Sequence, residues 1–570
     1  MKKNHKHLLA FAISTFYIVA VYFLIGIYFS TNDDRFMGEL MSGAITGNLE
    51  SHLVYVNYLL SLPLSLLYRI TTGISWFGIL LVLFHWFSCY CILDSFYSKA
   101  KTKTDICIST ILAGLLFLTE LYLISQISYT MTASFMATAG YVCLLLNENK
   151  KSRLGYFTVL ELLAFLLRDK AMLMIQPLGF AVFFGLVLID KNETVKTKLL
   201  QFIKIGAILI AIVAFGFIGN KIGYHSEHWK IYNEYNAART TLFDYSEFPP
   251  YEDVSHILEK YNVSETDYNA YAKYTILDWE LSLDCVKELA DYIEKKQSSP
   301  SLSAVLNDFK TATFEENYWQ VNTVLLCGFV CTILFLLISK NFLGFIPFVC
   351  FTLARTVIWL YLLYEGRFPL RIAMPLFTCE LVLLVTMNFY LYYQKQPYSK
   401  WQNVILVMIS AILGVIGLWS FKIQFVNFRQ MNQTHAIYMH GFDEVVDYCN
   451  ENSENRYILD TLNFIWYNGE VLDGTIYGER NCISAGSWLA GASTLFEGNK
   501  KYLEHTENGF YYIMLSEDEN TEEELAHPSV LYLADISNST PYVADSFVAS
   551  HGGTYSVIHF DGELNLKLNQ

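Results

Sequence analysis

Long apolar runs alternate with short polar segments along most of the chain. A membrane-spanning helix needs about 20 predominantly apolar residues. Eleven runs approach or exceed that length, at 8–29, 76–94, 106–123, 129–146, 154–167, 171–189, 199–219, 320–338, 342–363, 372–391 and 402–420. The run at 154–167 is short, so it and the following run are expected to form a hairpin or a broken helix. The pattern therefore predicts a mainly α, polytopic transmembrane bundle of eleven helices.

Two large polar blocks interrupt these runs, at 220–319 and 421–570. The first has helical periodicity, and Ser264 followed three residues later by Asp267 is typical of a helix start. The second combines a helical segment, HGFDEVVDYCNEN, with the β-rich runs RYILDTL, GFYYIML, SVLYLAD and TYSVIHF. We expect four regions: membrane helices at 1–219, a helical insertion at 220–319, membrane helices at 320–420 and a small α/β domain at 421–570.

Lysine and arginine decide the predicted orientation, because cytoplasmic loops carry an excess of both. Lys340 and the basic segments MKKNHKH, KAKTK, NKKSR, DKNETVKTK and QKQPYSK all fall on one side of the predicted topology. With that side cytoplasmic and eleven helices, the N-terminus is inside and the C-terminus is outside. The first helix is interpreted as a signal anchor that is retained. The predicted extracytoplasmic segments are 30–75, 220–319, 364–371 and 421–570.

The composition supports a membrane protein and argues against some partners. Hydrophobic residues make up 53% of the 570 residues and charged residues 16%, whereas soluble globular proteins carry about 25% charged residues. The net charge of −15 argues against nucleic acid, which requires basic patches. Most of the 11 cysteines lie in apolar runs, and no CxxC or Cys/His spacing indicates zinc. Cys449 and Cys482 form either a disulfide or a free buried pair.

The first predicted outer loop, residues 30–75, is expected to contain two helices. In DDRFMGELMSGAI the apolar residues fall on one helical face, and Asp33, Asp34, Glu39 and Ser42 lie largely off it. This pattern is typical of an amphipathic helix that lies in the membrane interface. The segment TGNLES breaks that helix, and HLVYVNYLLSLPLSLLYRI predicts a second helix that bends near Pro63.

Asp33 and Asp34, in the segment STNDDRF, are the most distinctive charges in the sequence. One acidic residue here is explained as a helix cap, because acid in the first turn suits the helix dipole. Two adjacent carboxylates at a membrane boundary repel each other and lose hydration, which raises the pKa of one of them. A raised carboxyl pKa is what a general base or acid requires. Both aspartates are therefore candidate catalytic residues.

The layout around this loop resembles that of the GT-C superfamily of integral-membrane glycosyltransferases, which includes the protein O-mannosyltransferases and the aminoarabinose lipid A transferases. The resemblance covers residues 1–420 in layout and rests in motif on NDD and the two helices behind it. In that superfamily an acidic residue of the first outer loop acts on the acceptor, and the donor is a polyprenyl-phosphate sugar. The resemblance implies that Asp33 or Asp34 is the catalytic base, without deciding which. No second acidic motif such as DxD is evident in another outer loop, so we expect no metal and no other cofactor.

Basic residues at two other outer turns are candidates for binding the phosphate of such a donor. The segment LLRDK places Arg168 and Lys170 between two apolar runs, and EGRFPLR places Arg367 and Arg371 in a turn bounded by Phe and Pro. Arginine suits phosphate because its planar group binds two oxygens at once. The alternative for each residue is a side chain that extends from a helix end to the lipid headgroups. We favour phosphate binding for Arg367 and Arg371.

Three further residues are candidates for lining the same cavity: Glu120, His52 and Glu365. Glu120 is an ionisable residue inside an apolar run, where charges usually face a cavity or a partner. For His52 the favoured alternative is an interfacial histidine whose hydrogen bonds are satisfied. Arg355 and Glu380 lie at comparable depth on neighbouring predicted helices and are expected to pair with each other.

The sequence therefore predicts a membrane glycosyltransferase that moves a sugar from a polyprenyl-phosphate donor to a glycan or lipid acceptor at the outer face of a plasma membrane. Lys- and Asn-rich loops favour a bacterial cell envelope and a role in polysaccharide biosynthesis. One alternative is a transporter or flippase of lipid-linked saccharides, but no internal repeat supports it. A polysaccharide polymerase or ligase and a non-catalytic sensor are also compatible with the pattern.

Overall fold

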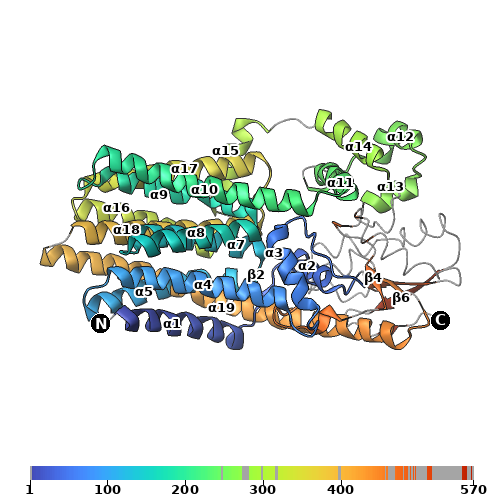
Figure 1. Ribbon diagram of the computed structural model, residues 1–570, viewed down its shortest axis with the longest axis horizontal. Coiled ribbons are helices and arrows are strands. Elements are labelled where there is room, and N and C mark those ends of the chain that lie inside the picture. Colours follow the sequence, from blue (N-terminus) through green and yellow to red (C-terminus); the bar gives the residue numbers. More distant parts are fainter. Residues whose placement is uncertain are drawn as a thin grey trace.

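The computed structural model describes most of the chain up to residue 455 and parts of the remainder. The described residues are 3–45, 47–244, 248–272, 281–296, 300–314, 319–395, 399–455, 457–459, 469–478, 481–484, 488–489, 492, 495, 510–515, 555–560 and 566–567. Most of these residues are helical, and the helices of the first half run side by side along the long axis of the molecule (Figure 1).

Nine of the described helices are long and apolar enough to cross a membrane. They are α1 (Lys3–Leu24), α4 (Trp76–Lys99), α7 (Tyr129–Leu146), α9 (Asp169–Ile189), α10 (Val195–Gly223), α16 (Trp319–Ile338), α17 (Phe345–Tyr364), α18 (Leu370–Lys395) and α19 (Lys400–Glu451). The chain is therefore a mainly α, multi-pass membrane protein, as predicted.

The two remaining apolar runs also lie on helices. The run at 106–123 is divided between α5 (Lys103–Thr119) and the short α6 (Leu121–Ser125), and the run at 154–167 lies on α8 (Lys150–Leu167). Neither α5 nor α8 meets the length and hydropathy that mark the nine longer helices. α8 and α9 are joined at Arg168 and pack against each other, which corresponds to the hairpin expected for the short run.

Helix α7 is the centre of the bundle. All of its residues are buried, and it packs against α4, α8, α9 and α18. Its sequence, YTMTASFMATAGYVCLLL, is rich in Ala, Gly, Ser and Thr, and such small residues let helices approach closely within a membrane. The helix begins after Ser128, whose hydroxyl oxygen accepts a hydrogen bond from the backbone N–H of Met131 at 3.2 Å. This capped N-terminus lies beside the candidate site.

The described part of the insertion at 220–319 consists of helices joined by short turns, as predicted. Its helices are α11 (Glu227–Asp244), α12 (Tyr251–Lys260), α13 (Glu265–Ala272), α14 (Leu283–Lys296) and α15 (Leu302–Phe314). The predicted helix start at Ser264 is confirmed, because the Ser264 hydroxyl oxygen accepts a hydrogen bond from the backbone N–H of Asp267 at 3.1 Å. Helix α11 packs against α14.

The first outer loop contains the two predicted helices, α2 (Asn32–Ser42) and α3 (Tyr58–Tyr68), and Pro63 lies inside α3. A two-residue strand, β1 (Tyr28–Phe29), precedes α2 and pairs in parallel with β2 (Gln126–Ile127). The apolar face of α2 is buried as expected. Its polar side is not exposed to solvent either. Glu39 and Ser42 are also buried, because residues of the C-terminal block cover α2. The guanidinium carbon of Arg35, which pairs with Glu39, lies 4.8 Å from the ring centre of Phe442 on α19. On the apolar face, the ring of Phe36 lies 5.4 Å from that of Trp488.

The C-terminal block begins inside a helix. α19 extends to Glu451, so the boundary expected at residue 421 falls within it. The described strands β3 (Tyr457–Leu459), β4 (Ile483–Ser484), β5 (Phe510–Leu515), β6 (Tyr555–Phe560) and β7 (Leu566–Lys567) form a sheet in the order β4-β3-β5-β6-β7. All neighbours are parallel except β6 and β7.

Three of the four predicted β-rich runs are strands in this sheet, and the fourth, SVLYLAD, lies outside the described residues. Cys449 and Cys482 are both buried, and a hydrogen bond links their reduced side chains, which matches the alternative of a buried pair without a disulfide. The first outer loop, helices α11–α14 and the C-terminal strands gather at one end of the bundle, opposite the N-terminus (Figure 1).

Candidate functional site

The candidate site lies where β1 connects α1 to α2. The backbone N–H of Ser30 donates to the carbonyl of Ile127 at 2.9 Å, which continues the β1–β2 pairing. Two residues beyond that strand, Tyr129 begins α7. The pairing therefore places the first turn of α2, with Asp33 and Asp34, directly against the N-terminal end of the central helix.

Asp34 is a buried structural residue. One carboxyl oxygen accepts a hydrogen bond from the backbone N–H of Tyr129 at 2.8 Å, and the other accepts one from the Thr31 hydroxyl at 2.9 Å. The first N–H groups of a helix have no partner within the helix, so Asp34 satisfies one of them for α7. Burial raises the pKa of Asp34 to about 8. Its side chain is completely enclosed, which keeps it from contact with a substrate.

Asp33 is the more accessible of the two aspartates. Its side chain is 18% exposed, and its Oδ2 lies 3.5 Å from Nη1 of Arg371. Burial raises the pKa of Asp33, and the positive charges of Arg371 and Arg168 oppose that rise. Asp33 therefore combines partial access, a raised pKa and a nearby guanidinium group, which are the properties of a candidate general base.

Arg168 lies at the same place from a third part of the chain. Its guanidinium carbon is 4.8 Å from the ring centre of Tyr55 and 5.3 Å from that of Tyr129. Such cation–π contacts hold a cation in position without neutralising its charge. Asp33, Arg371 and Arg168, which were candidates from three separate loops, are thus within electrostatic range of one another.

The structure adds two residues that the sequence did not indicate, Arg239 and Asp244 on α11. Both charges act on Asp33, and Asp244 Oδ2 lies 3.5 Å from Nη2 of Arg367. Arg239 is buried, and its Nε donates to the Asn236 side chain at 3.0 Å. Their segment, AARTTLFD, carries no motif. The only indication in the sequence is that Arg239 is a basic residue on the apolar face of its helix.

The remaining candidates lie outside this group. Lys170 and Glu365 are exposed. His52 has its ring 4.2 Å from that of Trp229 and its Nδ1 2.6 Å from Glu50 Oε1, which matches the alternative of a histidine with satisfied hydrogen bonds. Glu120 is buried within the bundle beside His85 and Cys89.

One other expectation about polar residues can be compared with the structure. Arg355 and Glu380 form the expected pair, with 2.7 Å between Nε and Oε2. The aromatic residues Trp229, Tyr232 and Tyr235 of α11 are buried. They therefore pack against the protein instead of forming an open stacking surface for a sugar.

The arrangement around Asp33 suits an anionic ligand and an acid–base step. Arg371 lies 3.5 Å from the partly exposed Asp33 carboxyl group, and the charges of Arg168 and Arg239 also act on it. Among the described residues, the group of His, Cys, Asp or Glu side chains that could hold a metal ion lies elsewhere, at Glu120. Asp33 and the side chains around it can accept a proton and stabilise negative charge.

Comparisons with known proteins do not assign this chain to a family. No protein-family model matches the chain, and neither the curated proteins nor the solved structures contain a significant match to it.

Proposed function

We propose that this protein is a membrane glycosyltransferase that moves a sugar from a polyprenyl-phosphate donor to a glycan or lipid acceptor. The observation that carries the proposal is the ion pair between Asp33, at the start of α2, and Arg371, at the start of α18. A base and a phosphate-binding cation on separate loops, with Arg168 beside them, are what such a transfer requires.

In the proposed reaction Asp33 accepts the proton of an acceptor hydroxyl. The acceptor oxygen forms a bond to the anomeric carbon of the sugar, and the bond from that carbon to the phosphate oxygen breaks. The polyprenyl phosphate leaves with the electron pair, and Arg371 and Arg168 stabilise its negative charge. No metal ion or cofactor takes part in the step.

The ion pair also gives the site a way to respond to the donor. A phosphate group that binds Arg371 draws its positive charge away from Asp33. Because that charge opposes the rise in the pKa of Asp33, donor binding makes Asp33 a stronger base. The base is then activated only when the phosphate is in place.

The proposal includes an arrangement in the membrane. α5 and α8 cross together with the nine longer helices, the N-terminus is cytoplasmic, and the site faces the outside of a bacterial plasma membrane. The C-terminal block forms an α/β domain that covers α2 and contributes to acceptor binding. This part rests on the lysine-rich loops and on the contact between Phe36 and Trp488.

The test is transfer activity of Asp33→Asn in purified protein, with labelled polyprenyl-phosphate sugars as donors. Loss of a general base is expected to lower the rate by about 100-fold or more. Asp169→Asn, which changes an exposed aspartate at the start of α9, is the matched control and keeps its activity. Full activity in Asp33→Asn would remove this residue from the mechanism. Translocation of an intact lipid-linked saccharide without transfer would instead favour a flippase.

A further inference from the structure

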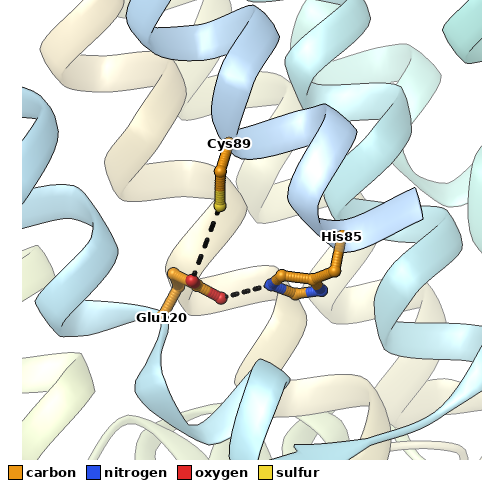
Figure 2. A group of neighbouring side chains, drawn as sticks. All are labelled: His85, Cys89 and Glu120. Carbon is orange, nitrogen blue, oxygen red and sulfur yellow. Dashed lines mark hydrogen bonds and ion pairs between the residues drawn. The ribbon is translucent and has the colours of Figure 1, made fainter. Parts of the chain in front are cut away.

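A second polar cluster lies within the bundle, apart from Asp33. It consists of His85 and Cys89 on α4 and Glu120 at the end of α5, and all three side chains are fully buried (Figure 2). His85 Nε2 is 2.6 Å from Glu120 Oε2, and Cys89 Sγ donates to Glu120 Oε1 at 3.9 Å. One ligand-type atom from each residue lies within 4.8 Å of the others.

The sequence explains how these groups meet. His85 and Cys89, in the segment HWFSC, are four residues apart, so they lie on one face of α4. Glu120 is the residue at which α5 ends and α6 begins. Packing of α4 against α5 then brings the carboxyl group to the His–Cys face. The third ligand is 31 residues beyond Cys89, which is why no short spacing in the sequence indicates the cluster.

We propose that His85, Cys89 and Glu120 bind one Zn²⁺ ion. Imidazole, thiolate and carboxylate are the three ligand types that Zn²⁺ takes in proteins. The charges favour this ion as well: Zn²⁺ with one thiolate, one carboxylate and a neutral imidazole carries no net charge. A neutral complex suits an apolar bundle, where an unpaired charge is costly.

The surroundings of the histidine fit this proposal. The His85 ring is held by stacking on Phe135, with 4.7 Å between ring centres. Its Nδ1 is buried and has no hydrogen-bond partner among the described residues. A proton can therefore move to Nδ1 when Nε2, which faces Glu120, binds the metal. Water or the hydroxyl of Tyr17, which lies within interaction range of Glu120 and Cys89, would supply the fourth ligand.

The ion would fix the end of α5 to α4, close to the candidate catalytic loop in the chain. From Glu120 the chain continues through α6 and β2 to Tyr129, whose backbone N–H is held by Asp34. A metal at the start of this short segment would brace the strand that positions α2. The proposal does not depend on the reaction at Asp33, because binding can be measured without any substrate.

Cobalt substitution in the purified full-length protein tests the site directly. After treatment with a chelator, the wild type is expected to bind one Co²⁺ per chain, and the bound ion gives the near-ultraviolet thiolate-to-cobalt charge-transfer absorption. Zn²⁺ is expected to displace Co²⁺ and to raise the melting temperature, because it binds the folded state. Binding weakens as pH falls, since thiol and imidazole must lose protons.

Two cysteine variants of α4 give the matched comparison. Cys89→Ser is expected to lose the charge-transfer absorption and at least about tenfold in Zn²⁺ affinity. Cys91→Ser changes another buried free thiol two residues away and is expected to keep both. A wild-type protein without the charge-transfer absorption would overturn the proposal, whatever the variants do. Equal Zn²⁺ affinity in the two variants would overturn it as well, leaving a metal-free His85–Glu120 pair.

Discussion

Asp33 and Asp34 are adjacent in the chain, but their surroundings give them different roles. Asp34 has both oxygens occupied by Thr31 and the backbone of Tyr129, so it holds α2 to α7. Asp33 precedes it by one residue on the same helix, and its partly exposed side chain lies beside Arg371. In the proposed function, the two adjacent aspartates divide capping and catalysis between them. The sequence singled out the two aspartates but not their different roles, because the partners of both residues come from distant segments.

The raised pKa of Asp34 predicts a specific dependence of stability on pH. The folded state keeps the Asp34 proton up to about pH 8, whereas the unfolded state loses it near 3.8. This contribution to stability is therefore complete at low pH and declines as pH rises to about 8, by up to about 1.4 kcal/mol per pH unit. Asp34→Asn is expected to lack this decline, when melting temperatures are followed by tryptophan fluorescence. Asp169→Asn serves as the control, and equal slopes in wild type and Asp34→Asn would contradict the prediction.

Arg371 is predicted to affect both the donor and the base. In Arg371→Gln a charge-assisted bond to phosphate is lost, so the KM for the donor is expected to rise by about tenfold or more. Because Arg371 lowers the pKa of Asp33, the acid limb of the pH–rate profile is also expected to move to higher pH. Arg69→Gln, which changes an exposed arginine after α3, should alter neither. An unchanged acid limb in Arg371→Gln would separate this arginine from Asp33.

At the scale of elements, the sequence pattern predicted those helices and helix starts that depend only on residues nearby in the chain. Most residues of every predicted apolar run are helical, and the predicted helix start at Ser264 is present. The end of α19 was not predictable in the same way. Its second half is polar enough to resemble a separate domain, yet the helix continues through Gly414 and Gly417 to Glu451 without a proline. The burial of the polar side of α2 also depends on a distant segment that covers it.

Substitutions at two glycines test how closely the helices pack. A Cβ added at Gly185 of α9 would lie 2.3 Å from the Cα of Pro347, whereas one added at Gly155 of α8 meets nothing within 4 Å. Gly185→Ala is therefore expected to cost roughly 1–3 kcal/mol, because α9 and α17 must move apart. Gly155→Ala is expected to be neutral or to stabilise by up to about 1 kcal/mol. Melting temperatures of the two variants decide this, and equal values would contradict the close packing of α9 on α17.

At the scale of the whole molecule, loops that are far apart in sequence converge at one end of the bundle (Figure 1). The distribution of lysine and arginine predicts that these segments share one side of the membrane, and the structure gathers them at one end of the bundle (Figure 1). It did not predict that the charges of Arg239 and Asp244 on α11 would act on Asp33, because their placement depends on how the insertion packs on residues 30–75 and on the C-terminal block. The contacts of such a site are set by tertiary packing, which short motifs do not record.

The proposed topology predicts where each terminus lies. With α5 and α8 crossing as well as the nine longer helices, an N-terminal tag is expected to be protected from protease in right-side-out vesicles. A C-terminal tag is expected to be cleaved. Inverted vesicles provide the control, in which the two results should exchange. Protection of both tags in right-side-out vesicles would mean an even number of crossings and would place the C-terminal block on the cytoplasmic side.

The most direct measurement of the central claim is an experimental structure of the protein with a polyprenyl phosphate bound. The account predicts that the phosphate lies between the first turn of α2 and the turn joining α17 to α18. Arg371 would then contact phosphate oxygens and no longer pair with Asp33, whose carboxyl group would face the space for the acceptor. A phosphate bound elsewhere, with Asp33 and Arg371 still paired at about 3.5 Å, would contradict the account.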